Sequence, residues 1–333
     1  MSVLFSKPNF PEISQLELAQ QLQGKKKAKE KLSTWFKTPG IYYPKKVNLE
    51  QTSSEKTAQY KAALVSGNQL VDLTGGFGVD TYFFSRKIPH ITHCEIDPEL
   101  HEIVSHNATS LGITNVDLRC EDGIEFLRNT SLEFDWIYID PSRRDESKNK
   151  VFQLSDCTPD VVMHLDLLLS KAGAIMIKTS PLLDLSAGLS QLRQVNEIHI
   201  IAVNNEVKEL LWILKKDNSV SDVKIRTINF VKNGQQVFEF DRREEKSSNC
   251  SFTDPQTFLY EPNSAILKAG GFRSLCNNFK VNKLHEHSHL YTSEPLLPFP
   301  GRVFKIIETI PFSKKSMKRF KGTKANVSTR NFP

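Results

Sequence analysis

The sequence predicts an α/β fold: a mostly parallel β-sheet with a helical segment before it and a small α+β domain after it. Between residues 65 and 190, short apolar segments typical of strands alternate with segments typical of helices, a pattern that favours a parallel sheet with helices on both faces. Residues 232–252 are polar, as expected of a linker. We therefore predict an N-terminal helical annex (1–64), a central domain (65–240) and a C-terminal domain (250–333).

The annex is predicted to contain several helices. Residues 11–36 have a helical pattern that is interrupted near Gly24. The apolar face predicted for its first part comprises Ile13, Leu16, Ala19 and Leu22. Further on, Thr52 and Glu55 have the spacing of a capping box, which predicts a helix that ends near residue 64 and leads into the first strand.

A glycine-rich turn follows the first predicted strand (69–71). It has the sequence Asp72-Leu73-Thr74-Gly75-Gly76-Phe77-Gly78 and precedes a predicted helix. Glycines let the backbone approach a ligand closely, and the first N–H groups of the helix remain free to bind it. Dinucleotides and S-adenosylmethionine are both bound in this way. A dinucleotide site needs Gly-x-Gly-x-x-Gly, but Thr81 stands where the third glycine would be.

Acidic residues follow the next three predicted strands. Glu95 comes 19 residues after Gly76, a spacing suited to the hydroxyl groups of a ribose in either class of cofactor. Asp122 follows the third strand, and enzymes that use NAD have no acidic residue that corresponds to it. Asp140 follows the fourth strand and opens the run Asp140-Pro141-Ser142-Arg143-Arg144.

On these motifs the central domain resembles the class I S-adenosylmethionine-dependent methyltransferases, which have a Rossmann-like sheet. In this resemblance Thr74 replaces the first glycine of the family motif. Glu95 would bind the ribose and Asp122 the adenine of S-adenosylmethionine. The cofactor-binding residues that the resemblance implies are Asp72, Thr74, Gly76, Gly78, Glu95, Ile96, Asp122 and Gly123.

The resemblance also implies the catalytic residues Asp140, Pro141 and Arg143. In the branch of the family that methylates amino groups, the first two residues of the motif accept the N–H groups of the target, and an aromatic residue stacks on the base. Arg143 replaces this aromatic residue, and a guanidinium can also stack on a base or bind a phosphate. The branch that methylates carbon 5 of pyrimidines uses a cysteine where this chain has Thr179, a much weaker nucleophile.

Three motifs extend the resemblance to bacterial methyltransferases with a THUMP-like C-terminal domain, whose catalytic part resembles the RNA cap guanine-N2 methyltransferases. They are Asp140-Pro141-Ser142-Arg143-Arg144-Asp145, Lys178-Thr179-Ser180-Pro181 and Asn205-Glu206-Val207-Lys208-Glu209. An RNA methyltransferase that acts on an exocyclic base nitrogen is therefore the leading hypothesis. The alternatives are an RNA-binding module with a degenerate cofactor domain, a methyltransferase for proteins or small molecules, and an NAD-dependent oxidoreductase.

The net charge of +6 is unevenly distributed. Residues 25–31 carry +4 and residues 314–330 carry +7, so the remainder is acidic. The two basic segments could bind RNA, or they could be solvated surface segments. No apolar run reaches the roughly 18 residues of a membrane span, and we expect a cytoplasmic protein without a membrane partner. The chain ends without a clear terminating signal, so we expect the natural protein to continue.

The five cysteines are widely spaced and contain no Cys-x-x-Cys motif. Cys94 and Cys120 fall in predicted buried strands, where cysteine is commonly a packing residue. We expect neither a disulfide nor a metal site. The cysteines are Cys94, Cys120, Cys157, Cys250 and Cys276.

Overall fold

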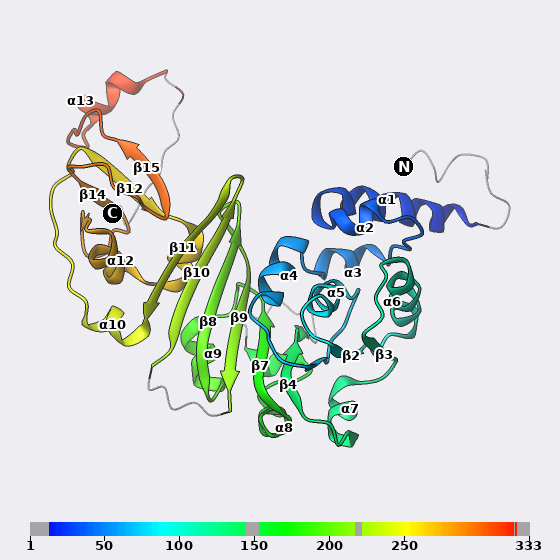
Figure 1. Ribbon diagram of the computed structural model, residues 1–333. Helices are drawn as coiled ribbons and strands as arrows, with labels where there is room; N and C mark the ends of the chain where they lie inside the picture. The colour runs from blue at the N-terminus through cyan, green and yellow to red at the C-terminus, as the bar shows by residue number, and fades with distance from the viewer. Residues whose placement is uncertain (1–12, 144–152, 217–221, 323, 325–333) are drawn as a thin grey trace. The chain divides into compact units, whose positions relative to one another are not determined.

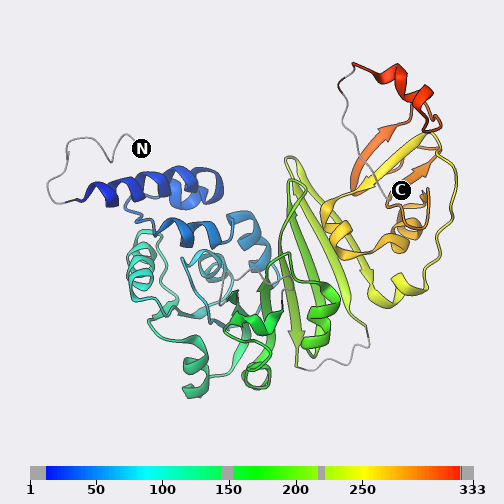
Figure 2. The same ribbon diagram turned by 180° about the vertical axis from the view of Figure 1, so that it is seen from behind.

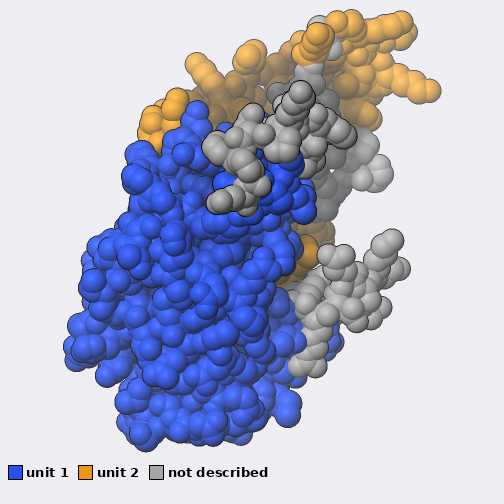
Figure 3. Space-filling view, turned by 90° about the vertical axis from the view of Figure 1, so that its right-hand side faces the viewer, with its two compact units in different colours: residues 1–179, 186–194, 212–218 blue, residues 180–185, 195–211, 219–333 orange. Residues whose placement is uncertain are grey.

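A computed structural model describes residues 13–143, 153–216, 222–322 and 324; the side chain of Arg143 lies outside this description, as do Arg144 and the end of the basic segment 314–330. The chain forms two compact units, coloured in Figure 3. Unit 1 comprises residues 1–179, 186–194 and 212–218, and unit 2 comprises residues 180–185, 195–211 and 219–333. The division into three domains made from the sequence stays a prediction.

The mixed α/β fold predicted from the sequence is confirmed. Its main sheet has nine strands in the order β11-β10-β8-β9-β7-β4-β1-β2-β3 (Figure 1). The five strands of this sheet that belong to unit 1 are β1 (Gln69–Asp72), β2 (His90–Cys94), β3 (Val116–Arg119), β4 (Phe134–Ile139) and β7 (Ala172–Thr179). Each pairs in parallel with its neighbour. The helices that follow them are α5 (Val79–Ser85), α6 (Pro98–Ser110), α7 (Gly123–Asn129), α8 (Leu165–Lys171) and α9 (Leu185–Gln191).

Parallel pairing places the ends of β1, β2, β3 and β4 along one edge of the sheet. The strands β4 and β7 are apolar and almost entirely buried, as expected for strands covered on both faces. The helix α6 begins at Pro98 with Asp97 as its N-cap. The helix α8 begins at Leu165, after turns at residues 161–164.

The annex contains α1 (Gln15–Lys31), α2 (Ser33–Lys37), α3 (Lys46–Gln51) and α4 (Glu55–Ala62). The predicted break at Gly24 and the predicted apolar face are both wrong. The helix α1 passes through Gly24 and buries a face of small residues that includes Ala19 and Ala28. A side chain at Gly24 would collide with Tyr43, so the close packing of these segments requires a glycine. The exposed apolar residues of the predicted face are Ile13, Leu16 and Leu22.

The predicted capping box at the start of α4 is also wrong. Ser54 is the N-cap, and its hydroxyl accepts a hydrogen bond from the Thr57 N–H group at 3.3 Å. The Glu55 side chain instead accepts a hydrogen bond from the backbone N–H group of Thr34, at the start of α2. This contact joins two annex helices that are distant in sequence.

Unit 2 contains β8 (Val195–Val203), β10 (Lys224–Val231) and β11 (Gly234–Asp241), and it shares β9 (Glu206–Lys215) with unit 1. The strand β10 is parallel to β8 and antiparallel to β11. The polar segment predicted as a linker therefore begins with a strand. Its apolar residues Phe238 and Phe240 are buried, and they alternate with polar residues that the linker prediction emphasised.

The C-terminal part of unit 2 has a four-stranded antiparallel sheet with the order β13-β14-β12-β15. Its strands are β12 (Phe258–Pro262), β13 (Asn282–Lys283), β14 (Tyr291–Ser293) and β15 (Gly301–Lys305). The helices here are α10 (Arg242–Ser247), α11 (Ser264–Ala269), α12 (Phe272–Phe279) and α13 (Lys314–Met317), followed by the 3₁₀ helix η3 (Lys318–Phe320).

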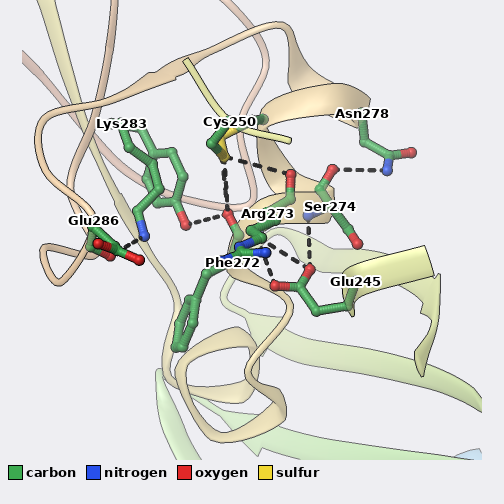
Figure 4. The surroundings of a disulfide bond; sticks show 10 residues. Glu245, Cys250, Phe272, Arg273, Ser274, Asn278, Lys283 and Glu286 are labelled. Atoms are coloured by element: carbon green, nitrogen blue, oxygen red, sulfur yellow. Dashed lines mark hydrogen bonds between the residues drawn. A yellow bond between two sulfur atoms is a disulfide. The ribbon is translucent and has the colours of Figure 1, made fainter. Parts of the chain in front are cut away.

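A disulfide joins Cys250 to Cys276, so the expectation of no disulfide is wrong (Figure 4). The two residues are 26 positions apart, and folding brings their Cα atoms to 5.7 Å. Glu245 on α10 accepts hydrogen bonds from the N–H groups of Arg273 and Ser274 at the start of α12, which holds this helix beside the chain that carries Cys250. Such tertiary proximity has no signal in cysteine spacing.

Cys94 is buried, as predicted, but Cys120 is exposed because β3 ends one residue before it. Among the described helices, none combines the length and the apolar composition required to cross a membrane.

Candidate functional site

The glycine turn connects β1 to α5 at the edge of the sheet where the acidic residues gather. Gly76 and Gly78 have φ angles of +56° and +75°, which favour glycine. A side chain at Gly75 would overlap the ring of His93 on β2. At Gly76 the nearest atom to an added Cβ would be 3.9 Å away. The backbone at Gly75 is therefore packed tightly against β2, whereas the backbone at Gly76 leaves room for a ligand.

Asp72 lies buried at the end of β1 and supports this turn. One carboxylate oxygen accepts a hydrogen bond from the N–H group of Thr74 at 3.1 Å, and the other accepts one from the Thr81 hydroxyl at 2.7 Å. The same hydroxyl lies 2.9 Å from Nδ1 of His93. Thr81 is thus part of a buried polar chain under the turn, which gives a structural reason for threonine where a dinucleotide site has glycine.

Burial shifts the pKa values of Asp72 and His93, the two ionisable groups among these hydrogen-bonded side chains. It raises the pKa of Asp72 to about 7, although the hydrogen bonds from Thr81 and Thr74 oppose the shift. It lowers the pKa of His93 to about 3. Folded Asp72 therefore keeps its proton up to about pH 7, and folded His93 is neutral above about pH 3.

These two shifts should have opposite effects on stability. Between about pH 4 and 7, folded Asp72 retains a proton that the unfolded carboxyl group loses, so stability falls as pH rises. Between about pH 3 and 6.5, unfolded His93 binds a proton that the folded residue does not, so stability rises with pH. We expect Asp72→Asn to make the free energy of unfolding rise more steeply from pH 4.5 to 6.5, by up to about 1.4 kcal/mol per pH unit, in urea titrations.

The complementary variant is His93→Gln, for which the same measurement should show stability falling with pH. Asp117→Asn is the control, because the side chain of Asp117 is half exposed on β3. If Asp72→Asn and His93→Gln left the pH dependence as in the wild type, the two groups would not be titrating as described.

Glu95 lies directly after β2 and faces the glycine turn. Its carboxylate accepts hydrogen bonds from the N–H group of Gly76 at 2.7 Å and from that of Asp97 at 2.8 Å. The next side chain, Ile96, is 67% exposed. An acidic group that can accept hydroxyl hydrogens therefore lies beside an apolar surface that can cover a ring.

Asp122 is the N-cap of α7, after β3. Its side chain accepts hydrogen bonds from the N–H groups of Ile124 at 2.8 Å and Glu125 at 3.0 Å. A Cβ at Gly123 would lie 2.3 Å from the carbonyl oxygen of Leu73, so α7 can begin this close to the end of β1 only with glycine. This packing brings Asp122 to the same edge of the sheet as the glycine turn.

Asp140 follows β4 and is held by two contacts in unit 1. Its N–H group donates a hydrogen bond to the Thr74 hydroxyl at 2.7 Å, and its carboxylate forms an ion pair with Lys178 near the end of β7. Pro141 is buried, and the described part of the chain does not include the side chain of Arg143. Thr74 therefore connects the turn after β1 to the turn after β4, a role that glycine could not fill.

Lys178 is a candidate functional residue that was not predicted on its own but only as part of the motif Lys178-Thr179-Ser180-Pro181. It is mostly buried. A buried lysine normally requires an anionic partner, and this requirement is the one signal that could have identified Lys178 as part of the site. Its neighbour Thr179 accepts a hydrogen bond from the indole N–H of Trp212 at 3.0 Å. The Thr179 hydroxyl thus has a structural partner in unit 1.

A second buried ion pair supports the site from the annex. Lys61 on α4 is fully buried, and its Nζ atom lies 3.1 Å from Asp80 on α5. Asp80 also accepts hydrogen bonds from Ser53 at 2.7 Å and from the hydroxyl of Tyr138 on β4 at 2.8 Å. Burial alone would raise the pKa of Asp80, but the charges of Lys61 and Lys178 and these hydrogen bonds outweigh it and lower the pKa. The network connects α4 of the annex to α5, which follows the glycine turn, and to β4, which precedes Asp140.

The structure thus brings the predicted residues of β1, β2, β3 and β4 to one edge of the sheet. The open backbone at Gly76, the carboxylate of Glu95 and the exposed side chain of Ile96 fit a ligand with hydroxyl groups and a flat ring. The carboxylate of Asp140 lies beside this cradle, because the N–H group of Asp140 is hydrogen-bonded to Thr74 in the glycine turn.

A solved structure that resembles the whole chain comes from Porphyromonas gingivalis W83 and is described as a "putative methyltransferase". It is 33% identical, with a TM-score of 0.91, and the match covers 99% of this chain and 84% of the other. A family model described as a ferredoxin-like domain matches residues 258–300. A comparison with curated proteins gave no match.

Two further solved structures match only the smaller part of the chain. An rRNA methylase from Streptococcus thermophilus is 16% identical, with a TM-score of 0.35, and the match covers 48% of this chain and 95% of the other. A methyltransferase-like protein from Streptococcus mutans, solved with S-adenosylhomocysteine, is 14% identical, with a TM-score of 0.35 and coverage of 48% and 96%.

Proposed function

The chain belongs to the same family as the P. gingivalis methyltransferase-like protein, and from this premise we propose that it is an S-adenosylmethionine-dependent methyltransferase that acts on an exocyclic base nitrogen of RNA. The observation that carries the proposal is the arrangement around Gly76. There an open glycine backbone, the carboxylate of Glu95 and the exposed side chain of Ile96 adjoin Asp140 within unit 1.

The cofactor would be held by the residues at the ends of β1, β2 and β3. Glu95 binds the ribose hydroxyls, Ile96 covers the adenine, and Asp122 accepts a hydrogen bond from the adenine amino group. The turn at Gly76 and Gly78 lies against the methionine part, and Asp72 keeps this turn in place through Thr74 and Thr81. The bound cofactor supplies an activated methyl group on a sulfonium.

The acceptor would be held by Asp140 and Pro141. The carboxylate of Asp140 and the carbonyl group of Pro141 accept the two N–H groups of an amine, which directs the nitrogen lone pair toward the methyl group. Positioning of this kind can supply much of the rate acceleration. Lys178 holds one carboxylate oxygen and leaves the other for the acceptor. Arg143 remains the predicted residue for stacking on the base or binding a phosphate.

Thr74 no longer argues for a degenerate cofactor domain. This hypothesis rests on the changes at Thr74 and Arg143, but the Thr74 hydroxyl accepts a hydrogen bond from the N–H group of Asp140. Threonine at this position is therefore compatible with the methyltransferase site that we propose.

Cofactor binding can be tested with Glu95→Ala. We expect the affinity for S-adenosylhomocysteine to fall about 10- to 100-fold, because the variant loses a charged hydrogen-bond acceptor and the contact that orders Gly76. Isothermal titration calorimetry measures the effect. Glu99→Ala is the control, because Glu99 is an exposed residue on α6. Equal affinities of the wild type and Glu95→Ala would contradict this assignment.

The acceptor can be tested by transfer of a labelled methyl group from S-adenosylmethionine to total RNA from cells that lack the protein. We expect label in RNA, and nuclease digestion should identify an N-methylated base. Intact cofactor binding without label in RNA would indicate a protein or small-molecule acceptor instead.

A further inference from the structure

The C-terminal end of unit 2 combines basic and aromatic residues on an exposed surface. Residues 301–322 contain seven basic residues and a single acidic one, Glu308. This segment includes β15, at one end of the strand order of the small sheet, followed by α13 and η3, drawn in orange and red in Figures 1 and 2. Its high positive charge makes it suited to a polyanion.

The strand β15 presents an aromatic ring beside an arginine. Phe304 is 45% exposed, although it pairs with Leu259 on β12. The guanidinium of Arg302 lies 5.6 Å from the centre of the Phe304 ring and forms an ion pair with Glu261. This ion pair holds Arg302 on the strand, where its guanidinium lies beside the exposed Phe304 ring.

The segment after β15 repeats this combination. Arg319 lies 5.2 Å from the centre of the Phe320 ring, and an ion pair with Glu308 holds it in place. Phe320 is 43% exposed and Phe312 is 70% exposed. Both rings therefore add exposed aromatic surface to a basic segment.

The lysines of residues 301–322 differ from the two arginines, because among the described residues no carboxylate forms an ion pair with them. Their ammonium groups remain available for a partner with repeated negative charges. They are Lys305, Lys314, Lys315, Lys318 and Lys321.

We propose that this surface, which we call the β15 surface and define by Arg302, Phe304, Lys314, Lys315, Lys318 and Phe320, binds single-stranded RNA. The lysines would contact phosphates, and Phe304 and Phe320 would stack on unpaired bases. The bases of a duplex are already stacked on one another, so a duplex could use only the lysines. The inference rests on the proposed function in that RNA is the acceptor, and it assigns to unit 2 the capture of the strand.

The first test measures binding of a fluorescently labelled 12-nucleotide single-stranded RNA by anisotropy, without cofactor. We expect Phe304→Ala to weaken binding about 5- to 150-fold, the range typical for loss of one stacked base. Phe252→Ala is a matched control, because Phe252 is 55% exposed and bridges to β13, at the other end of the sheet order. It should bind as the wild type does, and thermal melts should show that both variants are folded.

The second test varies the salt concentration. In the triple variant Lys314→Gln/Lys315→Gln/Lys318→Gln, the slope of log affinity against log salt should decrease in magnitude by about 2, because each phosphate contact to a single strand contributes about 0.7. Phe304→Ala should leave the slope unchanged. A 12-base-pair duplex should bind more weakly than the single strand and be insensitive to Phe304→Ala.

Wild-type affinity in Phe304→Ala, or equal affinities for duplex and single strand, would overturn the proposal, as would the absence of binding. The proposed function fails separately. If RNA binds through the β15 surface but receives no methyl group, only the assigned reaction is wrong. If Phe304→Ala methylates RNA as the wild type does, with an unchanged KM, only the assigned surface is wrong.

Discussion

Replacement of Lys61 by methionine is expected to lower the free energy of unfolding by about 3–5 kcal/mol, the cost of leaving a buried charge without its partner. Lys61 is fully buried and lies 3.1 Å from Asp80, which is itself buried. Methionine has nearly the same length and is apolar, so the main loss is the positive charge. Urea titration followed by circular dichroism measures the change.

Two further variants separate the charge from the packing. In Lys61→Met/Asp80→Asn the unpaired carboxylate is also removed, so the double variant should recover part of the stability that Lys61→Met loses. Lys46→Met is the surface control, because Lys46 is exposed on α3, and it should change stability by less than about 0.5 kcal/mol. A loss below about 1 kcal/mol for Lys61→Met would mean that Asp80 does not depend on this charge.

Lys61→Met should also weaken cofactor binding. Asp80 lies on α5, directly after the glycine turn, and it accepts a hydrogen bond from Tyr138, two residues before Asp140. The annex therefore supports the site through a charge in its last helix.

The features that could be predicted from the sequence are those that depend on residues close together in the sequence. The glycine turn and the strand-end acids Glu95, Asp122 and Asp140 all depend on local geometry. Their order along the chain also predicts the parallel sheet, because each strand is followed by a helix that returns the chain to the same edge.

The features that could not be predicted join residues that are distant in sequence. The ion pairs of Lys61 with Asp80 and of Lys178 with Asp140, and the disulfide between Cys250 and Cys276, form only when separate elements pack together. The buried face of α1 was missed for another reason. It consists of small residues that pack closely, and such a face is invisible to a search for large apolar side chains.

The largest effect on activity is expected for Asp140→Ala, which should reduce methyl transfer at least about 100-fold, because the acceptor loses the group that positions it. Affinity for S-adenosylhomocysteine should be unchanged, since Asp140 lies beyond the cradle of Gly76 and Glu95. Single-turnover rates with labelled S-adenosylmethionine and RNA measure the first effect, and calorimetry measures the second. Asp117→Ala, on exposed β3, is the control.

Two conservative variants show how Asp140 acts. Asp140→Asn keeps an oxygen that accepts hydrogen bonds but loses the ion pair with Lys178, so its rate should lie between those of the wild type and Asp140→Ala. Lys178→Met should resemble Asp140→Asn, because in both variants the acceptor group is present but no longer held by a charge. If Asp140→Ala retained full activity, the acceptor would have to be bound elsewhere; if only Lys178→Met did, Asp140 would be positioned by Thr74 alone.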